Sequence, residues 1–253
     1  MITFKGGKRA AIHKAKNFKF GKYCLTPLPA APASVDWGAR VTEWLMLGND
    51  EAGDCTCAAV GHGEMDFTSN ASTEFAPATD DVLAMYSAIT GYDPDAVPDV
   101  DGNNPTDTGA DMVTVLDYWR KTGLCGRTIA AYAEIDIANI EHLKLAIALL
   151  GGADLGVQLP QSAMDAFNAG QDWSDVMDQN ILGGHAVWAV GYDATGVFLI
   201  TWGKVVHATW DWIATYADEA FAVASPDWEE ASGESPSGID TAQMVADCAA
   251  IGK

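Results

Sequence analysis

The stretch Gly53-Asp54-Cys55-Thr56-Cys57-Ala58-Ala59-Val60 decides how the rest of the chain is interpreted. A glycine turn leads here into a run of small residues, and this pattern predicts a helix over residues 55–70. Cys55 would then lie at the helix N-terminus, where free N–H groups and the helix dipole favour negative charge and lower a thiol pKa. This position favours a reactive cysteine. Cys57, Cys125 and Cys248 are instead interpreted as small apolar residues of the interior.

A second stretch lies far downstream and reads Gly183-Gly184-His185-Ala186-Val187-Trp188-Ala189-Val190-Gly191-Tyr192. Its apolar run predicts a strand over residues 185–192 that carries an imidazole. An imidazole beside a thiol lowers the thiol pKa further and can carry its proton. A histidine on an apolar strand, taken alone, is more often a hydrogen-bonded core residue. Paired with the cysteine turn, His185 is the expected partner of the Cys55 thiol.

The size and composition of the chain predict a soluble protein with a sizeable core. It has 253 residues, of which 49% are hydrophobic, and no apolar run reaches the length of a membrane span. Residues 1–24 mix lysines with apolar and small residues, so we expect no secretory signal. We therefore expect a cytoplasmic location. Five cysteines without a regular framework predict a mostly reduced protein.

Charge is distributed unevenly along the chain, whose formal net charge is −21. Half of the 14 basic residues precede the first acid, Asp36, so a basic arm over residues 1–24 is followed by a strongly acidic body. An acidic body repels phosphate backbones, which argues against nucleic acid as the main ligand. Two interpretations of the arm stay open. It folds over the acidic surface of its own chain or of a neighbouring subunit or protein partner, or it binds nucleic acid.

The order of predicted elements indicates an α+β protein with two lobes. Helices are expected at 79–90, 111–123, 140–150 and 239–251, and strands at 129–135, 153–159, 185–192, 197–202 and 219–224. Residues 161–181 are expected to be irregular, and residues 209–216 to form a Trp-rich turn or short helix. The predicted divisions are the arm at 1–24, a domain at 25–225 with lobes at about 35–125 and 126–225, and an acidic linker with a C-terminal helix at 226–253.

Neither of two weak metal-binding patterns is convincing. Residues 99–103, within the long loop 93–111, faintly resemble a calcium loop, but the glycine comes too early and no glutamate closes the register. Cys55, Cys57 and His62 lack a fourth zinc ligand. We therefore expect no metal and no cofactor.

Four blocks of the chain occur in the order found in papain-like cysteine peptidases, and the chain resembles that family from about Val35 to Ser225. Residues 49–56, Asn-Asp-Glu-Ala-Gly-Asp-Cys-Thr, resemble the family's nucleophile block, and residues 111–124 resemble the helix after the substrate-side loop. Gly184-His185-Ala186-Val187 resembles the histidine strand. Residues 198–203, Phe-Leu-Ile-Thr-Trp-Gly, resemble the strand carrying Asn-Ser-Trp-Gly, and Trp210 with residues 221–223 resembles the closing strands.

The resemblance implies a fold and a set of site residues. The fold is papain-like, with a helical N-terminal lobe, an antiparallel β-barrel-like C-terminal lobe and a cleft between them. Cys55 takes the place of the nucleophile and His185 that of the base, with Gly53, Gly184 and Trp202 at the substrate cleft. Asn49 falls where the family has the glutamine that donates to the oxyanion, and the N–H of Cys55 would be the second donor.

The chain departs from the family at the residue that orients the histidine. Ile200 stands where the family has asparagine, and isoleucine cannot hydrogen-bond an imidazole, which leaves Thr201 as the candidate. The tryptophan that usually follows the nucleophile is Thr56.

Two functions therefore stay open. The first is a peptidase or amidase that hydrolyses a peptide or protein substrate through a Cys55–His185 dyad and an acyl-thioester. The second is a catalytically degenerate papain-like scaffold with a structural or binding role. A phage virion or assembly component docking through its arm would be one example, because chains with this nucleophile block resemble proteins of bacterial and phage genomes.

Overall fold

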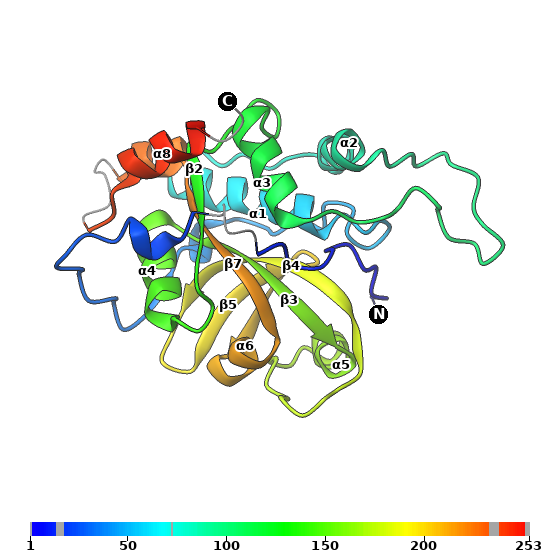
Figure 1. Ribbon diagram of the computed structural model, residues 1–253. Coiled ribbons are helices and arrows are strands. Elements are labelled where there is room, and N and C mark those ends of the chain that lie inside the picture. The colour runs from blue at the N-terminus through cyan, green and yellow to red at the C-terminus, as the bar shows by residue number, and fades with distance from the viewer. Residues whose placement is uncertain (1, 14–17, 72, 233–237, 251–253) are drawn as a thin grey trace.

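The computed structural model describes residues 2–13, 18–71, 73–232 and 238–250. It contains one antiparallel sheet with helices on both faces (Figure 1). The strands are β1 (Val35–Asp36), β2 (Ala131–Glu134), β3 (Ala153–Pro160), β4 (Ile181–Tyr192), β5 (Gly196–Thr201), β6 (Lys204–Thr209) and β7 (Ala217–Ala224). Their order is β2-β7-β3-β4-β5-β6, and β1 pairs with β4. The α+β class is confirmed, but the described strands form an open sheet and not the barrel-like one that we expected.

Strand alternation divides the interior into two cores. Val187 and Ala189 of β4 face one core, whereas Ala186, Trp188 and Val190 face the other. The first core is covered by α4 (Ile140–Leu150), α5 (Gln161–Ala169), α6 (Trp210–Tyr216) and α8 (Thr241–Ala250). The second is covered by α1 (Cys55–Asn70), α2 (Thr79–Thr90) and α3 (Met112–Lys121), which form the expected helical lobe.

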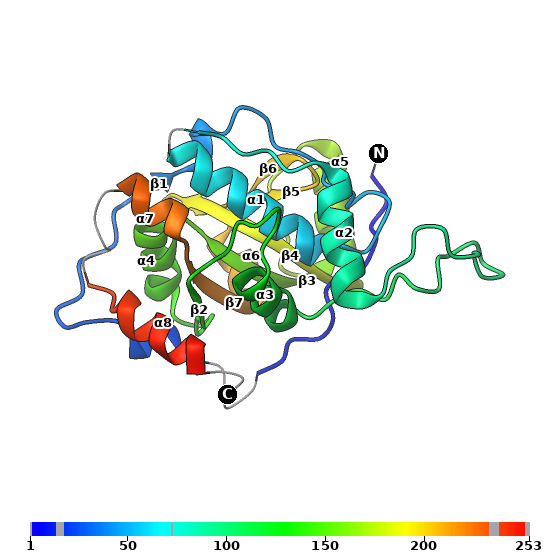
Figure 2. The same ribbon diagram turned by 90° about the horizontal axis from the view of Figure 1, so that it is seen from above.

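Helix α1 crosses the sheet over β4 (Figure 2) and is buried on nearly all sides. Gly63 permits this close approach, because a Cβ there would lie 2.9 Å from Trp119 and 3.3 Å from Trp188. Two buried carboxyls fix the helix: Glu64 Oε1 accepts from Trp119 Nε1 at 2.7 Å, and Asp66 Oδ2 accepts from Trp188 Nε1 at 2.9 Å. These contacts to α3 and β4 hold the position of Cys55 at the start of α1.

Three segments differ from the sequence-based expectation. Residues 161–181 were expected to be irregular, but their first half forms α5, whose Ala163, Met164 and Phe167 are buried. Strand β6 was not predicted, because its turn from β5 consists of Trp202 and Gly203, and tryptophan is not a turn signal. Residues 226–232 form the short helix α7 (Pro226–Ser232) and not a linker. The rest of the predicted linker, 233–237, lies outside the described residues, as do positions 14–17 of the arm and the last three positions of the chain.

Candidate active site

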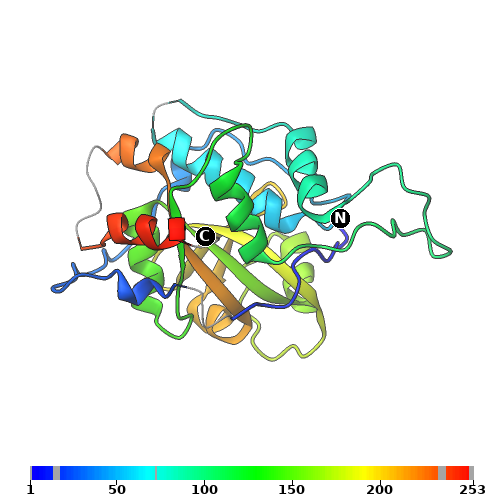
Figure 3. The same ribbon diagram turned by 45° about the horizontal axis from the view of Figure 1, so that its top comes forward.

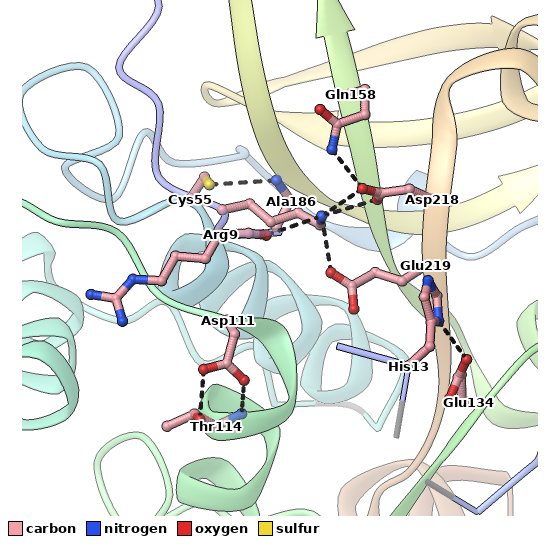
Figure 4. A network of polar contacts seen from close by, with 11 residues as sticks. Arg9, His13, Cys55, Asp111, Thr114, Glu134, Gln158, Ala186, Asp218 and Glu219 are labelled. Carbon is pink, nitrogen blue, oxygen red and sulfur yellow. Dashed lines mark hydrogen bonds and ion pairs between the residues drawn. The ribbon is translucent and has the colours of Figure 1, made fainter. Parts of the chain in front are cut away.

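Cys55 is the first residue of α1, as the glycine turn predicted. As the first helical residue, its N–H has no acceptor within the helix, and the helix dipole favours a negative sulfur there. Its Sγ accepts a hydrogen bond from the backbone N–H of Ala186 at 3.4 Å (Figure 4). This contact joins the N-terminus of α1 to β4 at the residue that follows His185, so the structure brings the two predicted stretches together.

His185 is fully buried and held from two directions. Its Nε2 lies 2.7 Å from the Thr201 hydroxyl at the end of β5, and its ring stacks on Trp202 with centroids 4.4 Å apart and planes at 15°. Its Nδ1 is buried and has no hydrogen-bond partner among the described residues. One ring nitrogen is therefore fixed, and the other is free to exchange a proton.

The turn between β5 and β6 explains why Thr201 contacts the imidazole. Trp202 and Gly203 both have positive φ, 46° and 68°, and Thr201 pairs with Lys204, as in a two-residue hairpin turn of type I′. Ile200 points into the core that contains Cys55 and Trp188, away from the ring. The polar neighbour of His185 is therefore the residue directly before the tryptophan.

Both groups are neutral in this structure. Burial raises the pKa of Cys55 to about 12, although the N–H of Ala186 opposes the rise. Burial also lowers the pKa of His185 to about 3, with smaller effects from His62 and Lys8. The proton therefore stays on sulfur, and no thiolate–imidazolium pair exists while the site is covered.

Asn49 is buried beside the cysteine turn, and its amide is engaged there. Its Nδ2 donates to Asp54 Oδ1 at 3.2 Å and to the Ala52 carbonyl at 3.4 Å. Burial raises the pKa of Asp54 well above its ordinary value, although the hydrogen bond from Asn49 opposes the rise. In this geometry Asn49 holds the turn in place, and its role as an oxyanion donor stays a prediction.

The N-terminal arm runs between the helical layer and the sheet (Figure 3), and its Gly7 lies against the Cys55 sulfur. The Gly7 carbonyl accepts from Ala110 N at 2.8 Å, and Arg9 N donates to the Ala110 carbonyl at 2.9 Å. On the other side Lys8 N donates to the Gly184 carbonyl at 3.3 Å. The arm thus bridges the two lobes as an extended segment, and it leaves Cys55 only 1% exposed.

Glycines form the walls of this channel. A Cβ on Gly7 would lie 2.1 Å from the Gly53 carbonyl oxygen and 3.0 Å from Cys55 Sγ. A Cβ on Gly53 would lie 2.4 Å from Gly6 O, one on Gly109 2.3 Å from Gly7 O, and one on Gly184 2.4 Å from Lys8 O. Since no side chain fits between arm and wall, the backbone approaches the sulfur directly. Gly53 and Gly184 thus line the channel that the arm occupies, whereas Trp202 stacks on the imidazole, and the substrate-cleft role of these three residues stays a prediction.

A series of hydrogen bonds joins the turn before Cys55 to the loop at residues 107–110. Asp107 accepts from Gly53 N at 2.9 Å and from the Tyr86 hydroxyl at 2.6 Å. The Tyr86 oxygen in turn accepts from Gly109 N at 2.8 Å. This network ties the turn before Cys55 to the loop whose Ala110 binds the arm.

Comparison with known proteins identifies the fold. The chain aligns with xylellain, a cysteine protease from Xylella fastidiosa, at a TM-score of 0.67 and 16% identity, over 89% of this chain and 98% of that one. The fold is papain-like. Digestive procathepsin L 3 of Tenebrio molitor larval midgut aligns at 0.58 and 15% identity, over 86% of this chain and 75% of that one. The ragweed cysteine protease Amb a 11 in its proform aligns at 0.54 and 15% identity, over 79% and 67%. No family model matches the sequence, and no curated protein does.

The papain-like fold carries further residues at the site that the sequence analysis did not single out. Gly6 and Gly7 lie in the predicted arm, and Glu219 begins a strand predicted at 219–224. Their signal was a Gly-Gly-Lys sequence in a basic arm that precedes an acidic body. The lysines of the arm pair with acids of the same chain. Lys8 pairs with Asp218 and Glu219, Lys19 with Glu134, and Lys22 with Asp247.

Two other properties bear on what the site can hold. No group of three His, Cys, Asp or Glu side chains in the described part of the chain is placed to bind a metal ion. Within the same residues, no helix is both long and apolar enough to cross a membrane.

Proposed function

We propose that this chain is a cysteine peptidase in which Cys55 is the nucleophile and His185 the general base. The observation that carries the proposal is the contact of Ala186 N with Cys55 Sγ, next to an imidazole whose Nδ1 is free and whose Nε2 is held by Thr201. A merely structural histidine at full burial would be expected to use both nitrogens. Xylellain and Amb a 11, two of the aligned structures, are cysteine proteases, which supports the same reaction class.

The proposed reaction begins when a substrate replaces the arm over Cys55. His185 accepts the thiol proton, and the sulfur attacks the carbonyl carbon of the scissile amide. The imidazolium then gives its proton to the amine nitrogen as the C–N bond breaks, which leaves an acyl-thioester on Cys55. Water, deprotonated by His185, attacks the thioester, the C–S bond breaks and the acid leaves, and the imidazolium returns its proton to the Cys55 sulfur. Thr201 acts as a positioning residue that keeps the ring oriented through Nε2.

The arm keeps the proposed enzyme inactive in this conformation. It excludes substrate from the cleft and water from the sulfur, and burial favours the neutral thiol and the neutral imidazole. Two of the aligned structures are named as pro-forms, procathepsin L 3 and the ragweed proform, which agrees with an inactive state of this kind.

Hydrolysis by an arm-displaced chain tests the proposal. Gly7→Ala would force a methyl group against the Gly53 carbonyl and displace the arm, so the full-length Gly7→Ala chain is the form to assay. It is expected to cleave fluorogenic peptide amides and to form a covalent adduct at Cys55 with a papain-type epoxide. Both activities should disappear in Gly7→Ala chains that also carry Cys55→Ala or His185→Ala.

The same chain provides controls for thiol chemistry. Cys125 is exposed and should react slowly with iodoacetamide in every variant, whereas Cys57 is buried and should not react. Labelling of Cys55 no faster than that of Cys125, together with no hydrolysis, would refute the enzyme and favour a papain-like scaffold with a binding role.

A further inference from the structure

The peptide group between Ala52 and Gly53, just before the proposed nucleophile, is held at both ends. Its N–H, which belongs to Gly53, donates to the two side-chain oxygens of Asp107 at 2.9 and 3.1 Å. Its carbonyl, which belongs to Ala52, accepts from Asn49 Nδ2 at 3.4 Å. A buried peptide group held in this way cannot rotate without leaving a donor or an acceptor unpaired. The path of the chain into Cys55 is therefore fixed from outside the turn.

Asp107 is in turn fixed by a hydroxyl of the helical lobe. Tyr86 belongs to α2, which packs beside α1 (Figure 2), and its hydroxyl donates to Asp107 Oδ1 at 2.6 Å. Burial, together with the bond to Asp107, raises the pKa of the Tyr86 phenol, so the hydroxyl keeps its proton. The same oxygen accepts from Gly109 N at 2.8 Å. One hydroxyl therefore holds both Asp107 and the loop two residues beyond it.

Gly53 is glycine because of what approaches it. A Cβ on Gly53 would lie 2.9 Å from Asp107 Oδ1 and 2.4 Å from Gly6 O. The φ angle of Gly53 is not positive, so close contact and not backbone conformation excludes a side chain here. Asp107 thus reaches the backbone of the cysteine turn as directly as the arm does.

The start of α1 has no capping side chain of its own. Asp54 is the N-cap residue, but its side chain makes no capping hydrogen bond. The proposed reaction needs the Cys55 sulfur and the Cys55 N–H at fixed positions relative to the attacked carbonyl. Both groups belong to the first residue of α1. Their position therefore depends on the contacts that Asp107 and Asn49 make with the preceding peptide group.

We propose that Asp107 and Tyr86 are positioning residues of the proposed peptidase. Asp107 holds the Gly53 N–H, Tyr86 holds Asp107, and the pair keeps Cys55 in place when a substrate replaces the arm. Both residues act through the Gly53 peptide group and not on the reacting atoms. The inference rests on the proposed function for its catalytic consequence, whereas the holding of the turn can be measured without catalysis.

The first test compares two Tyr→Phe variants of the full-length Gly7→Ala chain. The Tyr92 ring lies beside that of Tyr86, with centroids 5.1 Å apart, and its hydroxyl has no hydrogen-bond partner in the described part of the chain. Tyr86→Phe is expected to lower kcat about tenfold or more, because a small misplacement of a reacting group slows the reaction strongly. Tyr92→Phe should leave kcat unchanged. Rates are expressed per site titrated with the epoxide, so a smaller folded fraction cannot imitate the effect. Equal kcat values in the two variants would overturn the inference.

Variants of Asp107 test the other half of the pair in the same chain. Asp107→Ala removes the acceptor of the Gly53 N–H and should lower kcat at least as much as Tyr86→Phe. Asp107→Asn keeps an amide oxygen that accepts from the same N–H, and it should retain about tenfold more of kcat than Asp107→Ala. Equal losses in the alanine and asparagine variants would contradict a role through Gly53.

Hydrogen exchange separates failure of the inference from failure of the proposed function. The Gly53 amide is followed by NMR in the full-length Gly7→Ala, Cys55→Ala chain. Tyr86→Phe removes no atom that touches Gly53, yet it should speed exchange at Gly53 about tenfold or more. Exchange at Met65, in the middle of α1, should not change, which excludes general unfolding. If no peptide is cleaved, the peptidase proposal fails, and faster exchange at Gly53 still supports the positioning of the turn. Unchanged exchange at Gly53 refutes that positioning, whether or not peptides are cleaved.

Discussion

Replacing Gly7 with alanine should uncover the Cys55 thiol, and Gly6→Ala is the matched control one residue away. A Cβ on Gly7 would lie 2.1 Å from the Gly53 carbonyl oxygen and 2.4 Å from its carbon, both of which are backbone atoms that cannot move aside. A Cβ on Gly6 would meet only the Phe4 ring, at 3.3 and 3.6 Å, and that ring can rotate. The two changes are chemically identical and differ only in what the added methyl group meets.

The expected size of the effect follows from the contacts that hold the arm. Displacement of residues 7–9 breaks three backbone hydrogen bonds, to Ala110 twice and to Gly184 once. At a net ~1 kcal/mol each, their loss raises the open fraction by about 10²-fold. Since a buried thiol reacts only when the site opens locally, the labelling rate of Cys55 should rise by a similar factor.

The assay is alkylation with iodoacetamide at neutral pH, followed by mass spectrometry of the Cys55 peptide. Wild type and Gly6→Ala should label slowly and at the same rate, and Gly7→Ala should label about 10²-fold faster. Labelling of Cys125, measured in the same samples, corrects for reagent activity. Equal Cys55 rates in all three proteins would refute the reasoning, because the arm would then not be what covers the sulfur.

Three further predictions concern the buried groups. In the Gly7→Ala chain, Thr201→Val should lower kcat by about tenfold or more, because a buried imidazole nitrogen loses its partner, and Thr201→Ser should restore the rate and its pH profile. In the arm-covered chain, ultraviolet thiolate absorbance from Cys55 should be absent at pH 9, because burial raises its pKa to about 12, and it should appear near neutral pH in Gly7→Ala. Burial raises the pKa of Glu64 from 4.5 to about 7, so its stabilising contribution is present below pH 4.5 and lost as pH rises through 7. Glu64→Gln should therefore gain about 3 kcal/mol over wild type between pH 4.5 and 8 in denaturant unfolding, and a pH-independent difference would contradict this.

The sequence predicted those parts of the fold that have local signals. Helix α2 was predicted with its observed bounds, and α1 begins at Cys55 because a glycine turn and a run of small residues mark that start. Strand β6 was missed because Trp202 adopts a positive φ that its side chain does not favour, and its ring is held there by packing on His185 and Phe167. A local sequence pattern does not show when contacts with distant residues offset an unfavourable backbone conformation.

For the candidate site, too, the sequence indicates the residues that lie in recognisable local blocks and not those that meet only in the folded chain. Cys55 and His185 lie in blocks with recognisable neighbours, and Thr201 was found by elimination once Ile200 was seen to lack a polar group. The channel was not foreseen, because Gly7, Gly109 and Gly184 meet only after the lobes fold, across more than a hundred residues of sequence. Nor does any spacing rule connect Lys8 with Glu219.

The attachment of the arm to the chain that it blocks has a consequence for inhibitors. A tethered segment faces its site at an effective concentration on the order of millimolar, whatever the dilution of the protein. A free peptide or compound that competes for the cleft must therefore overcome a rival that never diffuses away. Molecules selected against the arm-covered form would be screened against an occupied groove, whereas the Gly7→Ala chain would present the groove vacant.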